Sequence, residues 1–519
     1  MIAVRVRRLA AVIAAVLLAG CAPIRIDAPQ VPSHAFDQPG STPLGQAYAR
    51  LLDATGASAF HLLVSGPDAF AARASLAEAA QRTLDLQYYI VTHDASSTVL
   101  LEAAVRAARR GVRVRLLVDD LNVGRHESHL ASLAGESNIE VRLFNPFSQR
   151  GGPGLPQLLE WMADGRLNRR MHNKLWIADG AVAVMGGRNL GDAYFNVSPD
   201  RDFADLDVLA AGPVVGAMGR SFDRYWNSEA AVPIASIGRP LGAAALETAR
   251  ADMAARADRF RDSEYVRALR RTAFGGLVRT GGVPVVVAPA QVLDDLPDDA
   301  RTPEVRPASA IFPQLRRSIE GAQKEVILVS PYLVPTPPGV EVLCGVARRG
   351  VRMRVLTNSL ASTDVPVVHS AYARYRSQLL ACGITLHELR PRGPRDAMAR
   401  LGLSSGASLH TKAMVVDGET VFLGSMNLDP RSRLLNTEVA LRIESRELGR
   451  QLTGLFDDAV RPDQVFRVEL AEPGNAAGSL HWDSLENGLP VRYLRDPLAS
   501  PWRRWLATLL GAFAPEAFL

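Results

Sequence analysis

The chain has 519 residues, a formal net charge of +5 and 47% hydrophobic residues. This length normally accommodates more than one domain, and this apolar fraction can fill a substantial core. Residues 1–20 contain three arginines and no acidic residue, so removing them lowers the formal charge from +5 to +2. A nearly balanced chain without a Lys/Arg tract is not expected to bind nucleic acid.

The N-terminus has the features of a bacterial targeting segment. Its arginines precede an apolar run at 9–19 that is too short to span a bilayer. The run ends in Leu-Ala-Gly-Cys, which resembles a lipoprotein cleavage box and would make Cys21 the acylated first residue of the mature chain. We therefore predict a signal peptide over 1–20 and a lipid-anchored protein that faces the periplasm. The alternative is an ordinary signal peptide or short anchor with an incidental cysteine.

The residues after Cys21 refine this prediction. Ala22 rather than Asp follows the cysteine, which in bacterial lipoproteins favours the outer membrane over the inner one. Residues 21–45 are rich in Pro, Ser and Gln and are predicted to form a flexible tether from the membrane.

The remainder of the chain contains two copies of the same series of strand-like and helix-like stretches. In each half a strand-like stretch, at 80–90 and at 322–333, precedes a helix-like run with a terminal glycine and an alternating strand. From the end of that helix-like run to the histidine motif described next, the spacing is 63 residues in the first half and 62 in the second. Matching order and spacing predict an internal duplication, and alternating strand and helix signals predict layered α/β domains.

Two of the chain's three lysines lie in one repeated motif, H-x-K-x4-D-x6-G-[GS]-x-N. Each copy reads as a β-hairpin, because two apolar runs flank an Asp-Gly turn dipeptide. On a strand, His and Lys at i and i+2 face the same side and can reach one pocket. Two compact ammonium groups beside two imidazoles indicate an anion pocket, with phosphate as the expected ligand. The copies comprise His172, Lys174, Asp179 and Asn189, and His410, Lys412, Asp417, Ser425 and Asn427.

The two motifs resemble those of the phospholipase D superfamily. The resemblance implies an α/β fold of two duplicated phospholipase D-like α/β/α sandwich domains in one chain, with the active site at their interface. We expect these domains at 46–235 and 306–470. A helical and loop segment at 236–305 is expected between them, and a tail at 471–519 is expected after them.

The same resemblance implies roles for the motif residues. Exchange of an alcohol on a phosphodiester needs a nucleophile, an acid for the leaving alkoxide and donors for the phosphoryl oxygens. One histidine forms a phosphohistidine, for which His172 is the expected nucleophile, although the two motifs are nearly symmetric. The remaining expected roles are general acid and base for His410, phosphate binding for Lys174, Lys412, Asn189, Asn427 and Ser425, orientation of the histidines by Asp205 and Glu438, and turn formation by Asp179 and Asp417.

One position departs from the family pattern. Asp205 lies in Phe203-Ala204-Asp205, where the commoner family sequence is Trp-Arg-Asp. No metal-ligand pattern is evident in the sequence, and the resemblance implies neither a metal nor another cofactor.

Further stretches, including Asn427 to Ser432 and Thr357 to Asp364, resemble the C-type branch of bacterial cardiolipin synthases. This implies transfer of a phosphatidyl group between two phospholipids, with phosphatidylethanolamine as donor and phosphatidylglycerol as acceptor, at a membrane surface. The alternatives are a hydrolytic phospholipase D with the same site, a nuclease of the superfamily, and a non-catalytic lipid-binding lipoprotein. The sequence does not specify a protein partner.

Two features lie outside the motifs. Cys344 and Cys382 fall in apolar helix-like runs without metal spacing. They are predicted to be buried free thiols, and the alternative is a disulfide, which the periplasm would permit. The stretch 502–510 in the tail is predicted to be either an interfacial amphipathic helix or a helix packed on its own domain.

Overall fold

The computed structural model describes residues 31–52, 56–124, 126–148, 157, 160–161, 164–198, 202–237, 242–297, 309–391 and 407–513. The predicted signal peptide and Cys21 lie outside these residues, as do residues 22–30 of the predicted tether. Within the described part of the chain, no helix is both long and apolar enough to cross a membrane.

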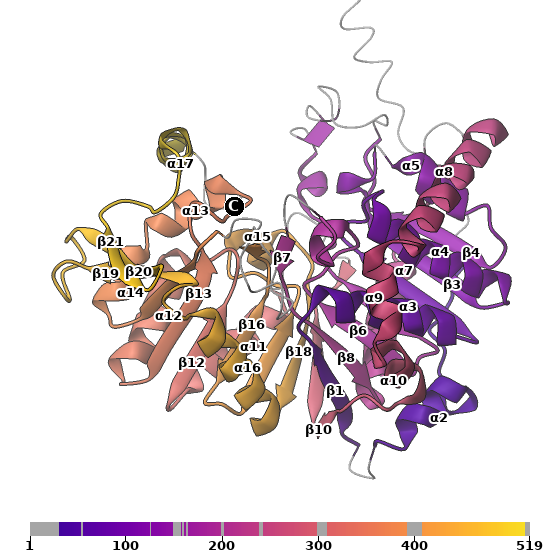
Figure 1. Ribbon diagram of the computed structural model, residues 1–519, viewed down its shortest axis with the longest axis horizontal. Coiled ribbons are helices and arrows are strands. Elements are labelled where there is room, and N and C mark those ends of the chain that lie inside the picture. The colour runs from indigo at the N-terminus through magenta and orange to yellow at the C-terminus, as the bar shows by residue number, and fades with distance from the viewer. Residues whose placement is uncertain are drawn as a thin grey trace, which may run out of the picture.

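Two large sheets organise the chain, one in each half (Figure 1). The first has nine strands in the order β10-β1-β8-β6-β5-β2-β3-β4-β9, and the second has ten in the order β11-β18-β17-β16-β12-β13-β14-β19-β20-β21. A short parallel pair, β7 with β15, joins the two halves.

The first half contains β1 (Ser58–Leu63), β2 (Thr83–Tyr88), β3 (Arg113–Asp119), β4 (Ile139–Phe144), β5 (Leu175–Ala178), β6 (Val182–Gly186), β7 (Asp202–Ala204), β8 (Asp207–Ala211), β9 (Ala231–Pro233) and β10 (Val286–Ala288). Its helices are α2 (Pro43–Ala49), α3 (Gly66–Ala79), α4 (Ala95–Arg109), α5 (Glu127–Leu133), α7 (Pro213–Trp226), α8 (Ala243–Arg261), α9 (Glu264–Arg271) and α10 (Phe274–Thr280).

The second half contains β11 (Ala290–Asp294), β12 (Glu325–Val329), β13 (Arg352–Asn358), β14 (Thr385–Leu389), β15 (Ala407–Leu409), β16 (Ala413–Val416), β17 (Thr420–Gly424), β18 (Val439–Glu444), β19 (Val465–Leu470), β20 (Leu480–Glu486) and β21 (Leu489–Tyr493). Its helices are α11 (Ile311–Gly321), α12 (Thr336–Arg348), α13 (Pro366–Ala373), α14 (Arg376–Ala381), α15 (Pro430–Leu434), α16 (Arg446–Ala459) and α17 (Pro501–Phe513).

The strand orders confirm the predicted duplication. The series β1-β8-β6-β5-β2-β3-β4 has the same order and strand directions as β11-β18-β17-β16-β12-β13-β14. In both sheets three central strands are parallel, β2-β3-β4 and β12-β13-β14, and each leads through a helix to the next. The predicted fold class, two duplicated α/β domains, is therefore correct.

The segment between the domains contributes to both sheets. β10 pairs antiparallel with β1 at the edge of the first sheet, and β11 pairs antiparallel with β18 at the edge of the second. Helices α8, α9 and α10 pack on the first domain. Buried side chains of both sheets and of α7 and α16 form one apolar cluster, so the two domains share a core at their interface.

The predicted tail also contributes to the second domain. β20 pairs with β19, the last strand of the predicted domain, and β21 pairs with β20. Beyond these strands, α17 lies against α13 (Figure 1).

The prediction of free thiols was wrong. Cys344 of α12 and Cys382, just after α14, form a disulfide. The apolar surroundings of both cysteines were read correctly, but the sequence could not show that α12 and α14 pack side by side and bring the two Cα atoms to 5.4 Å.

Candidate active site at the domain interface

Each motif forms the predicted β-hairpin, and its aspartate anchors the hairpin to the central strand. Asp179 and Gly180 both have positive φ, as a two-residue hairpin turn of this type requires. The Asp179 carboxylate also accepts the backbone N–H groups of residues 81–83, where β2 begins. Asp417 does the same for residues 323–325, where β12 begins. These contacts assign both aspartates to the hairpin structure.

Each histidine segment pairs with the opposite half of the chain. The His172 N–H donates to the Thr437 carbonyl at 2.9 Å. In the mirror arrangement, the His410 N–H donates to the Ala204 carbonyl at 2.8 Å, where β15 meets β7. Two crossed backbone connections therefore hold the motifs in one site between the domains.

The carboxylates are crossed in the same way. His172 Nδ1 lies 2.8 Å from Glu438 Oε2, and His410 Nδ1 lies 2.6 Å from Asp205 Oδ2. Both carboxylates are buried, while each histidine side chain retains 8% exposure. Because a carboxylate accepts, Nδ1 of each histidine carries a proton, and Nε2 faces the site, where it can hold a lone pair or a second proton.

The two carboxylates differ electrostatically. Burial raises the pKa of Glu438 to about 7, against the opposing effect of Lys174. Burial also opposes ionisation of Asp205, but His410 beside it lowers the pKa of that carboxyl to about 2. Asp205 is therefore more strongly ionised at neutral pH than Glu438.

The two histidines differ in how readily they bind a second proton. Burial, followed by the charges of Lys174 and Lys412, holds the pKa of His172 well below its usual value. Burial and Lys412 also lower the pKa of His410, but Asp205 opposes this shift. His410 consequently retains a proton more readily than His172.

Both motif lysines are buried beside their histidines. Lys174 Nζ donates to the His172 carbonyl, and Lys412 Nζ donates to the His410 carbonyl. Burial lowers the pKa of Lys174 to about 7 and that of Lys412 to about 8. Burial removes the water that would stabilise the two ammonium charges. An anionic ligand would stabilise them instead, so the site favours an anion.

The predicted phosphate-binding amides and hydroxyl have different surroundings. Asn189 accepts from the Ile90 N–H and donates to the Tyr194 hydroxyl, which fixes its amide. Asn427 is buried, and its Oδ1 has no hydrogen-bond partner among the described residues. Ser425 donates to Glu438 Oε2 and accepts from the Val439 N–H, so its hydroxyl positions the carboxylate.

The variable position in the motif is explained by the two carboxylates. A Cβ atom on Gly187 would lie 2.1 Å from Asp205 Oδ1, so this position must lack a side chain. At the equivalent position of the second motif, Ser425 instead supplies the hydroxyl that holds Glu438. The motif therefore has Gly where Asp205 needs the space and Ser where Glu438 needs a hydrogen-bond donor.

Several supporting residues were not predicted from the sequence. Asp119 accepts the N–H of Met171, and Asn358 pairs with both backbone groups of Leu409, so the last residues of β3 and β13 fix the segments before the histidines. Their equivalent positions at the ends of repeated strands were the available signal. Arg188 donates to the Asp205 carbonyl, and thereby supports the aspartate whose usual neighbouring arginine is absent.

Aromatic rings line both histidines. The Tyr89 ring lies 4.9 Å from that of His172, and its face receives Lys174 Nζ at 5.5 Å from the centroid. The Tyr194 and Phe203 rings lie 5.3 and 5.0 Å from the His410 ring. Tyr89 belongs to the repeated strand-like stretch at 80–90, whose sequence predicts the duplication but not a contact with His172.

The chain is similar to known phospholipid-synthesising enzymes. The family described as "Cardiolipin synthase, PLD-like domain" matches residues 74–226 and 315–460. Cardiolipin synthase C of Escherichia coli (strain K12) is 39% identical over 464 residues, which cover 87% of this chain and 94% of that protein. Cardiolipin synthase A of Pseudomonas entomophila (strain L48) is 25% identical over 407 residues, 77% of this chain and 68% of that protein.

Among solved structures, the phosphatidylserine synthase of Haemophilus influenzae shares the fold. Its TM-score is 0.53 at 12% sequence identity, and the match covers 82% of this chain and 91% of that one. The family match extends over both halves of the duplication and includes both histidine motifs. The chain therefore belongs to the cardiolipin synthase family of the phospholipase D superfamily.

Proposed function

We propose that this protein is a phosphatidyltransferase that joins two phospholipids into cardiolipin through a phosphohistidine intermediate. The observation that carries the proposal is the crossed pair of histidine–carboxylate contacts, His172 with Glu438 and His410 with Asp205. Two oriented imidazoles and two lysines in one site provide the nucleophile, the acid and the phosphate-binding cations that phosphodiester exchange requires.

The first half-reaction uses both histidines. His172 Nε2 attacks the phosphorus of the donor phospholipid and forms a P–N bond. The P–O bond to the donor's head-group alcohol breaks, and His410, in its imidazolium form beside Asp205, gives its Nε2 proton to the departing oxygen. Lys174 and Lys412 bind the non-bridging oxygens, on which negative charge is held throughout.

In the second half-reaction the acceptor alcohol replaces the departed one. His410, now neutral with a lone pair on Nε2, takes the proton of the acceptor hydroxyl, whose oxygen attacks phosphorus and breaks the P–N bond. Assignment of His172 as nucleophile rests on the lower pKa of its imidazole, and assignment of His410 as acid rests on the charge of Asp205 beside it.

The substrates and location belong to the same proposal. Phosphatidylglycerol is the proposed acceptor and phosphatidylethanolamine the proposed donor, as the resemblance to the C-type branch of cardiolipin synthases implies. Exchange of one phosphodiester for another is nearly isoenergetic, so the reaction can proceed without a nucleotide. A lipid anchor at Cys21 would hold the site at a periplasmic membrane surface, where its substrates lie.

The proposal is tested with purified protein in mixed micelles of phosphatidylglycerol and phosphatidylethanolamine, with products identified by mass spectrometry. We expect cardiolipin from the wild type and none from His172→Ala or His410→Ala. His34→Ala is the matched control, because that side chain is 76% exposed and lies outside the site. Phosphatidic acid as the sole product would identify a hydrolase instead, and full activity in either motif variant would refute the two-histidine mechanism.

A further inference from the structure

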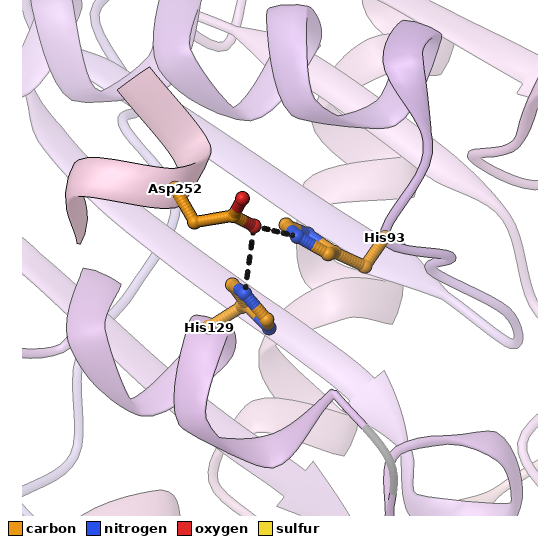
Figure 2. A group of neighbouring side chains, drawn as sticks. All are labelled: His93, His129 and Asp252. Carbon is orange, nitrogen blue, oxygen red and sulfur yellow. Dashed lines mark hydrogen bonds and ion pairs between the residues drawn. The ribbon is translucent and has the colours of Figure 1, made fainter. Parts of the chain in front are cut away.

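A second group of histidines lies outside the active site. His93 precedes α4, His129 lies in α5 and Asp252 lies in α8 (Figure 2). Figure 1 shows α5 and α8 on the side of the first domain that faces away from the second. The phosphoryl-transfer chemistry does not use these residues.

Three potential ligand atoms converge within this group. His93 Nε2 lies 2.7 Å and His129 Nε2 lies 3.4 Å from the same oxygen, Oδ2 of Asp252. Figure 2 shows both rings directed at that oxygen from different sides. Ligand atoms around a tetrahedral zinc ion stand roughly 3.3 Å apart, given Zn–N and Zn–O distances of about 2.0–2.1 Å. The His129–Asp252 spacing matches this value, whereas the shorter His93–Asp252 contact is a hydrogen bond that a bound ion would replace.

The surroundings also suit a cation. The two histidine side chains are 11% and 19% exposed, so an ion could enter from solvent and still be mostly enclosed. Nδ1 of His129 is buried without a hydrogen-bond partner among the described residues. His129 therefore makes no hydrogen bond through its second ring nitrogen in this arrangement.

Two features determine what binding would change. The imidazoles are stacked with their centroids 3.4 Å apart, so one ring must rotate about its Cβ–Cγ bond to direct its lone pair at a shared ion. Arg256 lies 3.5 Å from Asp252 Oδ2 and would give up this contact to the ion. Its side chain is 34% exposed, one turn along α8, and can extend into solvent.

From this geometry we infer that His93, His129 and Asp252 form a site for a divalent transition-metal ion, with zinc as the best match to two imidazoles and one carboxylate. The ion would connect α8, from the segment between the domains, to α5 and to the start of α4. The role of the ion would be structural, because it would cross-link these elements and none of its ligands belongs to the two histidine–carboxylate pairs.

The test uses the full chain freed of any oligohistidine tag. After dialysis against a chelator, zinc binding is titrated in competition with a chromophoric chelator, and melting is followed with and without zinc. The wild type should bind one zinc with a positive melting shift. His93→Ala, His129→Ala and Asp252→Asn should each weaken binding at least tenfold and abolish the shift, whereas His34→Ala should change neither.

Two results would overturn the inference. One is zinc binding by the wild type that is no tighter than binding by the three variants. The other is loss of binding in His172→Ala or His410→Ala but not in His93→Ala, which would place the ion on the catalytic histidines.

An independent observation concerns the C-terminal segment. Among the described residues ten large hydrophobic side chains are exposed, and six of them lie between residues 489 and 509. Trp502, Trp505 and Leu509 are 65%, 53% and 40% exposed. Their spacing of three and four residues places them on one face of α17, where the two indoles stack.

The opposite face of α17 holds the helix to the protein. Arg503 donates to the carbonyl of Leu360, Arg504 donates to that of Asp496, and Ala507 is buried. The Leu360 loop follows β13, whose last residue, Asn358, fixes the segment before His410. The exposed apolar face is thus attached to the frame of the active site.

We propose that this face of α17 docks on the surface of a phospholipid bilayer and directs the active site toward lipid head groups. Tryptophan is favoured at the membrane–water interface, and a helix with one apolar and one polar face lies in the plane of that interface. The proposal rests on the proposed function, because phospholipid substrates place the bilayer next to the site.

The test measures co-sedimentation with vesicles of phosphatidylcholine and phosphatidylglycerol. All proteins carry Cys21→Ala, so that acylation does not contribute. Trp502→Ser with Trp505→Ser should lower the partition coefficient about tenfold or more, given the apolar area of two indoles. Leu277→Ser, an exposed apolar residue on α10, should leave it unchanged.

Catalysis in detergent micelles is measured in parallel and should survive the tryptophan changes. Failure of the proposed function would appear as an absent lipid product in wild-type micelle assays, whatever the vesicle result. Equal vesicle binding by the double variant would refute the docking surface. So would loss of a wild-type dimer in the double variant without loss of vesicle binding, because the face would then contact a second copy.

Discussion

Glu438 lies 266 positions after His172 in the chain, yet its Oε2 atom is 2.8 Å from the imidazole Nδ1. The converse contact joins His410 to Asp205 of the first half. Each half therefore carries the histidine of one pair and the carboxylate of the other. Neither domain can complete its own pair, which explains why the motifs function as a unit at the interface.

Replacing the carboxylates by amides tests this dependence. Glu438→Gln and Asp205→Asn keep the shape but no longer stabilise the Nδ1 proton, so the wrong tautomer becomes accessible. We expect the turnover number to fall about 10²- to 10⁴-fold in each variant, by analogy with general acid–base groups elsewhere. Rates at saturating lipid provide the measurement, and unchanged circular dichroism provides the control for folding. A loss of less than threefold would contradict the orienting role.

Gly187 provides a test of the space that Asp205 needs. In Gly187→Ala the new methyl group would meet Asp205 Oδ1 and displace the carboxylate from His410. We expect a large loss of turnover with the Michaelis constant little changed, because lipid binding does not use this methyl-sized gap. The matched control is Gly454→Ala on α16, where a Cβ atom meets nothing within 4 Å. Equal activity of the two variants would be the contrary result.

The chain contains its own control for the motif lysines. Lys174→Met and Lys412→Met remove buried ammonium groups, and we expect at least a 10²-fold loss of catalytic efficiency, since phosphoryl oxygens would lose a desolvated cation. Lys324→Met should be neutral, because this third lysine is exposed. Arginine should not restore activity at 174 or 412, since its planar fork does not fit a site built around a compact charge. Efficient catalysis by either arginine variant would show that the pocket is more open than its burial indicates.

The motif residues show how much of the fold and of the site could be predicted from the sequence. The Asp-Gly turns of the two motifs predicted the hairpins, the matching order and spacing predicted the duplication, and the family resemblance implied a site shared by the two domains. The Gly187 and Ser425 difference was visible but had no explanation. Each residue contacts a carboxylate of its own half, Asp205 or Glu438, and that carboxylate serves the histidine of the other half. The disulfide and the His93–His129–Asp252 group were also missed. Their members come from separate elements, and only the packing of helices brings them together.

The raised pKa of Glu438 predicts a pH dependence of stability. Its folded value of about 7 against 4.5 corresponds to about 3 kcal/mol by linkage. A carboxyl with a raised pKa stabilises the fold fully below its unfolded pKa, and this contribution is lost as the pH rises through the folded pKa. We therefore expect wild-type stability, relative to Glu438→Gln, to fall between about pH 4.5 and pH 7. Denaturant titrations at a series of pH values measure this difference, and parallel curves for the two proteins would exclude it.

The Cys344–Cys382 disulfide supports a prediction about both stability and compartment. It closes a loop with a sequence separation of 38, for which chain entropy gives about 4 kcal/mol. Cys344→Ala with Cys382→Ala should lower the free energy of unfolding by several kcal/mol, and reductant should destabilise the wild type but not the double variant. The bond also requires an oxidising compartment. Alkylation of the protein in intact cells before lysis should therefore find both thiols blocked. Reactive thiols in freshly quenched cells would argue against export, and would leave Cys21 without the acylation that the proposed anchor needs.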